Sequence, residues 1–318
     1  MNEPGPTGEK AAHRYLLLVN PSAGGGRSRG RLPAVQAALG TAGVDYELVM
    51  TSHLEHGCEL AIAAAADGRI PVVMSGDGMI GKVGGALAGG DVPLGVIPGG
   101  RGNDFARVVG IPTEPADAVQ NLLADRRRRI DVGEANGARF LCIASCGFDS
   151  DANRIANEAR LVKGPLVYAY AALRALSQWK PARFTLECEL DGGGTADAHR
   201  EFSGYSVAVA NSKAYGGGMF VAPDAELDDG LLDVVTTADV SRSSFLRGLP
   251  DVFKGTHVKR PEVGYFRCRS VRVEADRPFT VYADGEAITE LPAMIRLLPR
   301  ALEVIAPPDA PPPLPDGR

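Results

Sequence analysis

The sequence lacks several features that would assign it to common protein classes. Its cysteines number five and form no CxxC pair, and an odd count without metal-type spacing indicates reduced, mostly buried thiols in a cytoplasmic protein. No apolar run reaches the about 20 residues that a membrane-spanning helix needs. Residues 1–13 are polar and include two prolines, so we expect no signal peptide. A net charge of −5 gives no indication of a general affinity for nucleic acid.

Two common nucleotide-binding fingerprints are also missing. No GxGxxG run is followed by an acidic residue about 20 positions later, so the dinucleotide-binding fingerprint is absent. No GxxxxGK[ST] run is present either, which excludes a P-loop enzyme.

What the sequence does contain is enough apolar material for a sizeable core, and a clear change of pattern. The chain has 318 residues, 45% of them hydrophobic, which suggests one large domain or two of moderate size. Up to about residue 134, short apolar runs alternate with helical patterns and predict an α/β domain with a parallel, Rossmann-like sheet. Beyond it, alternating β-type runs predict a mainly antiparallel β-sandwich, interrupted by one helix at about 165–179. These runs are 140–144, 184–190, 206–210, 231–236, 271–275 and 279–282.

The stretch 72–107 organises the rest of the chain. It predicts two consecutive strand–turn–helix units, with glycine-rich turns at 75–78 and 98–104. Such turns at the carboxyl ends of strands are the usual ligand position in an open α/β sheet. Glycine lets backbone amides approach a phosphate, whereas Asp77 suits magnesium or its waters. One glycine turn alone is equally well explained as structural, but two in succession that both carry an aspartate favour a phosphate site.

These motifs resemble the catalytic domain of the soluble diacylglycerol kinases, with their bacterial lipid-kinase relatives and the sphingosine kinases. The family's nucleotide loop, usually Gly-Gly-Asp-Gly-Thr, aligns with residues 75–79. Its Pro-x-Gly-Thr-x-Asn-Asp-Phe-Ala-Arg signature aligns with residues 98–107. Further matches at 20–24, 147–149, 211–219 and 282–286 extend the resemblance over almost the whole chain.

The resemblance implies two domains and two tails. Residues 14–134 and a returning C-terminal segment, 289–306, would form the nucleotide-binding domain, and 135–288 a β-rich domain for the lipid substrate. Residues 1–13 and the proline-rich 307–318 are expected to be disordered.

The resemblance also implies which residues contact ATP. They are Asn20, Pro21, Thr51, Ser75, Gly76, Asp77, Gly78, Met79, Ile80, Gly81, Arg101, Asn103 and Asp104. Asp77 would hold the catalytic magnesium through water, and Asp131 would join Asp77 and Asp104 in one acidic cluster around it. The chain departs from the family pattern at Met79 and Arg101, where threonine is usual, and at 81–82, where Gly-Lys replaces Asn-Glu.

The remaining implied residues lie far along the chain. Asp284 would be the general base, supported by Glu286, although an Asp-Gly pair after a strand is also a common hairpin turn. A structural magnesium would bind the Asp229 carboxylate and the main-chain carbonyls of Glu226 and Leu231, although the same loop could be an Asp-Gly turn that needs no metal.

The implied activity is ATP-dependent phosphorylation of a lipid hydroxyl, with diacylglycerol converted to phosphatidic acid and Mg²⁺ as cofactor. The alternatives are a kinase of a sphingoid base or ceramide, and a nucleotide-binding regulatory module with little turnover. We expect a cytoplasmic protein that meets its lipid at a membrane surface, and a homodimer is one option for its assembly. The four arginines at 126–129 could attract anionic headgroups, although such a run is more often a solvated face.

Overall fold

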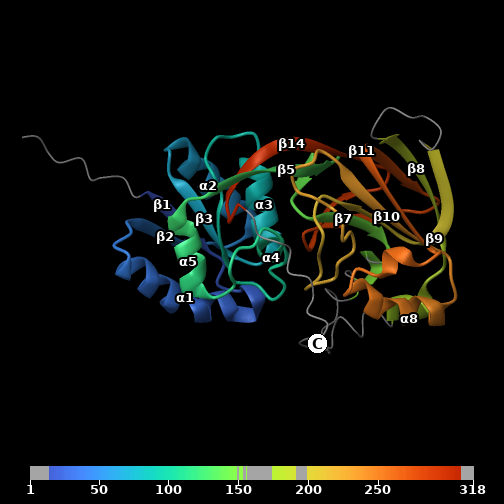
Figure 1. The fold of residues 1–318 in the computed structure, drawn as a ribbon, viewed down its shortest axis with the longest axis horizontal. Helices are drawn as coiled ribbons and strands as arrows, with labels where there is room; N and C mark the ends of the chain where they lie inside the picture. The colour runs from blue at the N-terminus through green and yellow to red at the C-terminus, as the bar shows by residue number, and fades with distance from the viewer. Residues whose placement is uncertain (1–13, 149, 153–154, 156–173, 191–198, 309–318) are drawn as a thin grey trace, which may run out of the picture.

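The computed structural model describes residues 14–308 apart from 149, 153–154, 156–173 and 191–198. Two domains lie side by side, each built on its own sheet, and strand β14 (Ala293–Ile305) runs along one edge from one domain to the other (Figure 1). The predicted tails, 1–13 and most of 307–318, fall outside the described residues.

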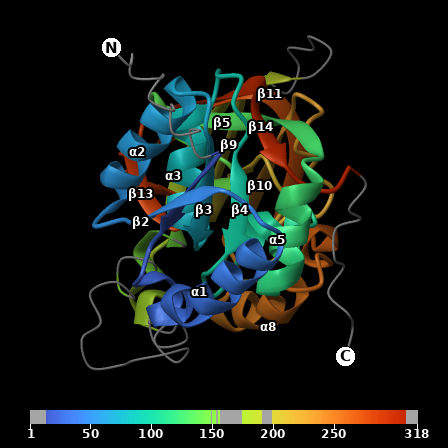
Figure 2. The same cartoon turned by 90° about the vertical axis from the view of Figure 1, so that its left-hand side faces the viewer.

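The first domain is a four-stranded parallel sheet covered by helices on both faces. Its strand order is β2-β1-β3-β4, and every pairing is parallel. Helices α1 and α5 lie on one face and α2 and α3 on the other (Figure 2). The elements are β1 (Tyr15–Val19), α1 (Ala23–Thr41), β2 (Tyr46–Met50), α2 (Leu54–Ala66), β3 (Ile70–Ser75), α3 (Asp77–Leu87), β4 (Gly95–Pro98), α4 (Asp104–Val108) and α5 (Pro115–Ala124).

The continuous apolar runs of these strands follow from burial on both faces. Along β1, Leu16 and Leu18 pack into the core beneath α2 and α3, whereas Leu17 and Val19 pack into the core beneath α1 and α5. A strand covered on both faces has no solvent side, so its sequence shows no polar alternation. The two predicted glycine turns follow the carboxyl ends of the neighbouring strands β3 and β4, so they lie at the same end of the sheet.

The second domain is a ten-stranded sheet in which all the described pairings are antiparallel. Strand β8 pairs with both β9 and β11, so the sheet folds over and encloses a second apolar core. Both predicted sheet types are therefore confirmed. The elements are β5 (Arg127–Ala135), β6 (Ala138–Phe140), β7 (Ile143–Gly147), β8 (Ala182–Leu190), β9 (His199–Ala210), β10 (Leu232–Ala238), α8 (Arg242–Val252), η1 (His257–Lys259), β11 (Val263–Ala275), β12 (Thr280–Ala283), β13 (Glu286–Glu290) and β14.

Strand β14 connects the two domains. Its first four residues pair with β11, and along most of its length it pairs with β5. Near its end the Leu94 amide donates to the Glu303 carbonyl (2.8 Å) and the Ile305 amide to the Leu94 carbonyl (3.0 Å). Leu302 and Val304 are buried in the core that α2 and α3 cover. The predicted return of the C-terminal segment to the first domain is thus confirmed.

The arginine run agrees with the more common of its two interpretations, a solvated face. Residues 127–129 belong to β5, and their arginines make ion pairs with Asp125, Glu303, Asp228 and Asp91. They form a paired, partly solvated face rather than a free cationic cluster. The predicted helix at 165–179 lies mostly outside the described residues, and 174–178 are helical. Among the helices that the structure describes, none is both long and apolar enough to cross a membrane.

Candidate active site

A pocket of about 870 Å³ lies between the two domains, and we call it the interdomain pocket. At one end it is bounded by the turns after β1, β3 and β4, and at the other by apolar side chains of the second domain and α8. Most of the predicted site residues line it. They are Asn20, Ser75, Gly76, Asp77, Gly78, Met79, Arg101, Asp104, Asp284 and Glu286.

The glycine turns interlock at the first end of the pocket. A Cβ on Gly100 would lie 2.5 Å from the Gly76 Cα, so the two turns approach more closely than any side chain allows. Asn103, at φ 53°, fixes the second turn because its Oδ1 accepts the Gly100 amide at 2.8 Å. Gly76 itself is extended and precedes the first residue of α3. Amides at the start of a helix are suited to holding an anion.

Asp77 and Asp104 converge beside this anion site. Asp77 Oδ1 accepts the Phe105 amide (3.0 Å), and Asp104 Oδ2 accepts the Gly217 amide (2.7 Å). A Cβ on Gly102 would lie 3.0 Å from Asp104 Oδ2 and 3.3 Å from Asp77 Oδ2, so both carboxylates border the same small space. Burial raises the pKa of Asp104 above its ordinary value, the Gly217 amide opposes this, and the charge of Asp77 adds to the rise.

This pair fits a divalent cation. Asp104 Oδ1 is buried and has no hydrogen-bond partner among the described residues. A buried carboxylate oxygen without a partner is costly, and a hard cation with oxygen ligands would satisfy it and relieve the repulsion from Asp77.

Asp131 does not join this pair, contrary to the sequence prediction. Its carboxylate accepts the Arg300 amide (2.6 Å) and the Gly230 amide (2.8 Å). Burial raises its pKa, and the charges that raise it further are those of Asp229 and Asp228 rather than those of Asp77 and Asp104. In the part of the chain that the structure describes, no three His, Cys, Asp or Glu side chains come together in a metal-binding group.

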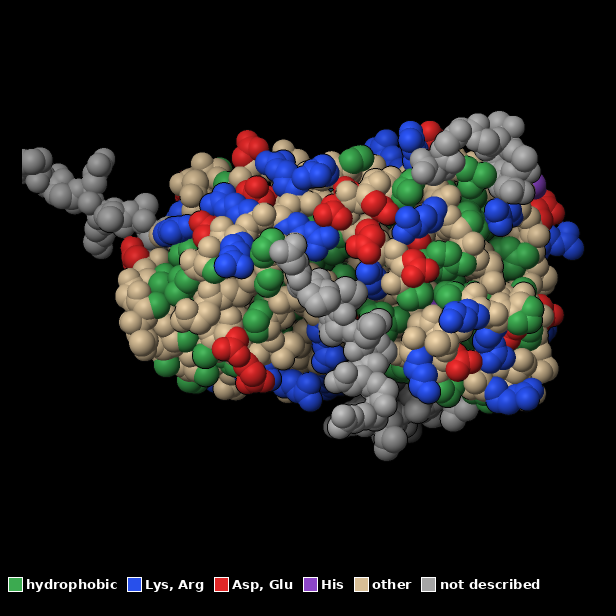
Figure 3. Space-filling view, in the orientation of Figure 1, with side chains coloured by type: hydrophobic (Ala, Val, Ile, Leu, Met, Phe, Trp, Pro, Cys, Tyr) green, Lys and Arg blue, Asp and Glu red, His purple; other side chains and the backbone are tan. Residues whose placement is uncertain are grey.

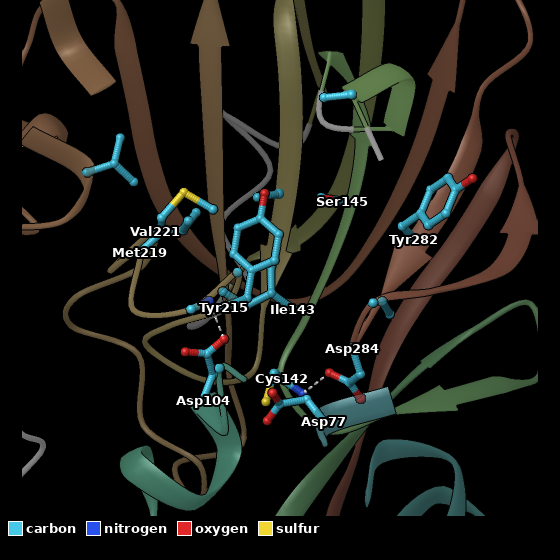
Figure 4. Close-up of a pocket in the computed structure, with 18 of the residues that line it drawn as sticks. Asp77, Asp104, Cys142, Ile143, Ser145, Tyr215, Met219, Val221, Tyr282 and Asp284 are labelled. Carbon is cyan, nitrogen blue, oxygen red and sulfur yellow. Dashed lines mark hydrogen bonds between the residues drawn. The ribbon is translucent and has the colours of Figure 1, made fainter. Parts of the chain in front are cut away.

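Asp284 reaches the pocket from the second domain. Its carboxylate accepts the Leu141 amide (2.7 Å) and the Cys142 amide (2.9 Å), and it faces Asp77 across the pocket floor (Figure 4). Burial raises the pKa of Asp284 to about 6, although the two amides oppose the rise and Asp77 adds to it. A carboxylate that titrates near neutrality is a better proton acceptor than one with an ordinary pKa.

Helix α3 packs directly against Asp284. A Cβ on Gly81 would lie 2.3 Å from Asp284 Oδ2, and a Cβ on Gly78 would lie 2.9 Å from Glu286 Oε1. The glycine that replaces the family's usual asparagine at 81 therefore makes the room that Asp284 occupies. Two segments about two hundred positions apart in the printed sequence thus meet at the pocket.

Five further predicted residues are not among the pocket-lining residues, and four of them contact residues that are; for Pro21 no such contact is seen among the described residues. Thr51 is buried, its hydroxyl donates to the Val19 carbonyl (3.3 Å), and it contacts the Met79 sulfur (3.8 Å). The Met79 side chain packs against Thr51 and Gly57, so it does not replace the lost threonine hydroxyl at the pocket. The other residues of this group are Pro21, Ile80, Gly81 and Asn103.

Sequence reasoning missed two kinds of site residue. The amides that hold Asp284 and Asp104 belong to Leu141, Cys142 and Gly217, and backbone groups leave no mark in a sequence. It also missed the apolar end of the pocket, where Phe148, Phe245 and other side chains form the wall. In α8, Phe245, Leu249 and Val252 recur at helical spacing, a signal that could have located this wall although Pro250 interrupts the pattern.

The side-chain contacts of the loop around Asp229 do not fit the predicted structural magnesium. In this described loop, Asp229 Oδ1 accepts the Leu231 amide (3.0 Å), and Oδ2 lies 3.2 Å from Nη1 of Arg267. Arg267 also contacts Asp233 Oδ1 (3.1 Å) and donates to the Asp224 carbonyl (2.7 Å). The Asp229 carboxylate that the predicted magnesium would use is therefore already paired with a guanidinium.

Comparison with known proteins agrees with this architecture. The family described as "Diacylglycerol kinase catalytic domain" matches residues 14–135, and "YegS C-terminal NAD kinase beta sandwich-like domain" matches 142–306. A diacylglycerol kinase of Mycobacterium tuberculosis (strain ATCC 25618 / H37Rv) is 37% identical over 301 residues, which are 92% of this chain and 95% of the relative. One of Bacillus subtilis (strain 168) is 29% identical over 306 residues, with 92% and 96% covered.

A crystal structure of a diacylglycerol kinase from Bacillus anthracis str. Sterne has the same fold, with a TM-score of 0.70 and 22% identity over 94% of this chain and 99% of that one. Fold and pocket thus define a two-domain phosphotransferase that acts on an alcohol group. The chain belongs to the diacylglycerol kinase family.

Gly81→Ala should impair turnover without unfolding the protein. The new methyl group would meet the Asp284 carboxylate and displace it, so we expect kcat to fall about tenfold or more, as a small misplacement of a reacting group does. Gly30→Ala is the matched control, because its Cβ would meet nothing within 4 Å on the same kind of helical backbone. Equal kcat values for the two variants would contradict the proposed contact.

Arg267→Gln should destabilise the fold. The substitution removes the positive charge that pairs with the fully buried Asp233 carboxylate. The Tyr265 hydroxyl would still donate to that carboxylate (2.5 Å). Because the Arg267 side chain is 36% exposed, we expect a discounted loss of about 2 kcal/mol in the free energy of unfolding, measured by urea denaturation. Arg272→Gln, on the same strand but in an exposed pair with Glu274, should cost less than about 0.5 kcal/mol. A similar loss of unfolding free energy in both variants would show that the Arg267–Asp233 pair is not the source of the effect.

Proposed function

We propose that this kinase transfers the γ-phosphoryl group of ATP to a lipid hydroxyl, with diacylglycerol as the preferred acceptor and phosphatidic acid as the product. The observation that carries the proposal is that Asp284, the Asp77–Asp104 pair and the glycine turns border one pocket, which continues into an apolar end. A polar end of this kind suits a triphosphate, and the apolar end suits acyl chains.

Of the predicted amides from Gly76 to Ile80, the triphosphate would lie on those of Gly76 to Met79 at the start of α3, because the Ile80 amide donates to the Gly76 carbonyl (3.2 Å). Arg101 extends toward the glycine stretch 24–26 that follows β1, since a Cβ on Gly25 would lie 2.9 Å from its Nη2. A guanidinium there is placed to make a charge-assisted contact with a phosphate oxygen, which would compensate for the threonine missing at 101. The chain thereby supplies binding and orientation, the main contributions of a protein to phosphoryl transfer.

Magnesium would be held by Asp77 and by the unpartnered Oδ1 of Asp104. When bound, it supplies positive charge that offsets the charge of the β- and γ-phosphates. The Phe105 amide holds the Asp77 carboxylate and the Gly217 amide holds that of Asp104, so their orientation does not depend on the nucleotide.

Asp284 would orient the acceptor hydroxyl and take its proton. As the bond forms between the lipid oxygen and the γ-phosphorus, the bond from that phosphorus to the β,γ-bridging oxygen breaks, and ADP leaves. The raised pKa of about 6 suits this role. The acyl chains would extend past Ile143 and Met219 (Figure 4), and Phe245 lines the same pocket.

A panel of lipids in mixed micelles with γ-labelled ATP tests the assignment. We expect label in phosphatidic acid when diacylglycerol is supplied, and much less when sphingosine or ceramide is supplied at the same mole fraction. Label mainly in one of those lipids would replace the acceptor assignment. Tight ATP binding without label in any lipid would overturn the catalytic proposal in favour of a regulatory nucleotide-binding module.

Turnover should also depend on the ionisation of Asp284. Because its pKa is raised to about 6, the proton-accepting form is present above that pH and is lost as the pH falls through it. We expect kcat to fall below about pH 6, and Asp284→Asn to lower it about 100-fold and abolish this acidic limb. Asp276→Asn, a substitution of an exposed aspartate in the same domain, should leave the profile intact. An unchanged acidic limb in Asp284→Asn would exclude Asp284 as its source.

A further inference from the structure

Helix α8 has two faces with different surroundings. Phe245, Leu249 and Val252 line the apolar end of the interdomain pocket. The solvent-exposed side carries Leu246, which is 40% exposed and does not line the pocket. The adjoining Phe253 does line the pocket and is 47% exposed, so it lies at the pocket rim. None of the helix residues is buried. Of the five exposed large hydrophobic side chains in the described chain, one lies on the helix and one directly follows it.

The same outer face is cationic. Arg242, Arg247, Lys254 and Lys259 are exposed, and none of them makes an ion pair with another described residue. The nearby acids Asp251 and Glu262 are instead paired with Arg260. Lys and Arg side chains gather over α8 at the lower right of the molecule (Figure 3). We call this face, Arg242, Leu246, Arg247, Phe253, Lys254 and Lys259, the α8 face.

The α8 face differs from the arginine run at 126–129, which the sequence had suggested for the same purpose. There, Arg127, Arg128 and Arg129 are paired with acids, so their charge is largely compensated. On the α8 face the cations make no ion pair with a described residue and lie beside exposed apolar side chains. That combination matches the interfacial region of a bilayer, where apolar groups enter the acyl boundary and cations meet anionic headgroups.

We propose that the α8 face docks on an anionic phospholipid bilayer and so brings the apolar end of the pocket to the membrane. The inference rests on the proposed lipid acceptor and names the surface through which that acceptor is reached. A bilayer is favoured over a protein partner because the helix that carries the cationic face is also a wall of the apolar pocket. A lipid that leaves the bilayer beside α8 would therefore have a short path to Asp284.

Vesicle flotation with the full chain tests the docking surface. The probes are vesicles of phosphatidylcholine with and without phosphatidylglycerol. We expect binding to the anionic vesicles, reduced roughly 25-fold in Arg247→Gln/Lys254→Gln, at roughly fivefold for each cation. Leu246→Glu should reduce it about tenfold or more, because it removes apolar area and adds a repelled charge. Ile62→Glu, at a residue 50% exposed elsewhere, and Arg29→Gln are the matched controls and should bind as the unmodified chain does.

Turnover on a monomeric short-chain diacylglycerol separates docking from catalysis. Leu246, Arg247 and Lys254 do not line the pocket, so these variants should keep their activity on the monomer and lose it on vesicles. The proposal is overturned if the α8 variants float with anionic vesicles as well as the controls do, if the unmodified chain does not float, or if Leu246→Glu acts by dissociating a dimer. Docking through α8 by a chain that phosphorylates no lipid would instead refute the proposed function alone.

Discussion

A buried carboxylate held between two domains is the constraint on which the site depends. Asp284 comes from the second domain, its oxygens accept two amides at the start of β7, and α3 of the first domain packs against it with glycine at the contact. A carboxylate this deeply buried is costly unless it is hydrogen-bonded, and the two amides lower that cost without removing it. The relative position of the domains therefore sets both the orientation and the proton affinity of one side chain.

Close packing of backbone explains why glycine recurs around the pocket. Gly76 meets Gly100, Gly102 meets two carboxylates, and Gly81 meets Asp284, each at a distance that a Cβ would violate or compress. The departures at 79 and 81 belong to this packing: Met79 fills the space beside Gly57, and Gly81 leaves space for Asp284. Both departures therefore affect how α3 packs against α2 and against Asp284.

Much of this arrangement could be predicted from sequence because it depends on local pattern. Continuous apolar runs identified the buried parallel strands, alternation identified the antiparallel ones, and two glycine turns located the anion end. The partners of individual carboxylates could not be predicted in this way. Asp131 lies in a strand next to the first domain, and nothing in its surrounding sequence indicates that Gly230 and Arg300 supply its hydrogen bonds. Likewise, Arg267 on β11 lies beside Asp229 because of the register between β10 and β11, and the sequence pattern does not specify that register.

The course of β14 has a consequence for synthesis on the ribosome. Leu302 and Val304 complete one core of the N-terminal domain and Ile305 completes the other, on the opposite face of its sheet. Domains usually fold in order as they emerge, but this one stays unfinished until the second domain and β14 have been added. Its nascent form must persist with apolar surface uncovered while the whole second domain is translated, so the interval in which a chaperone could bind it is set by the length of the second domain rather than by the size of the first.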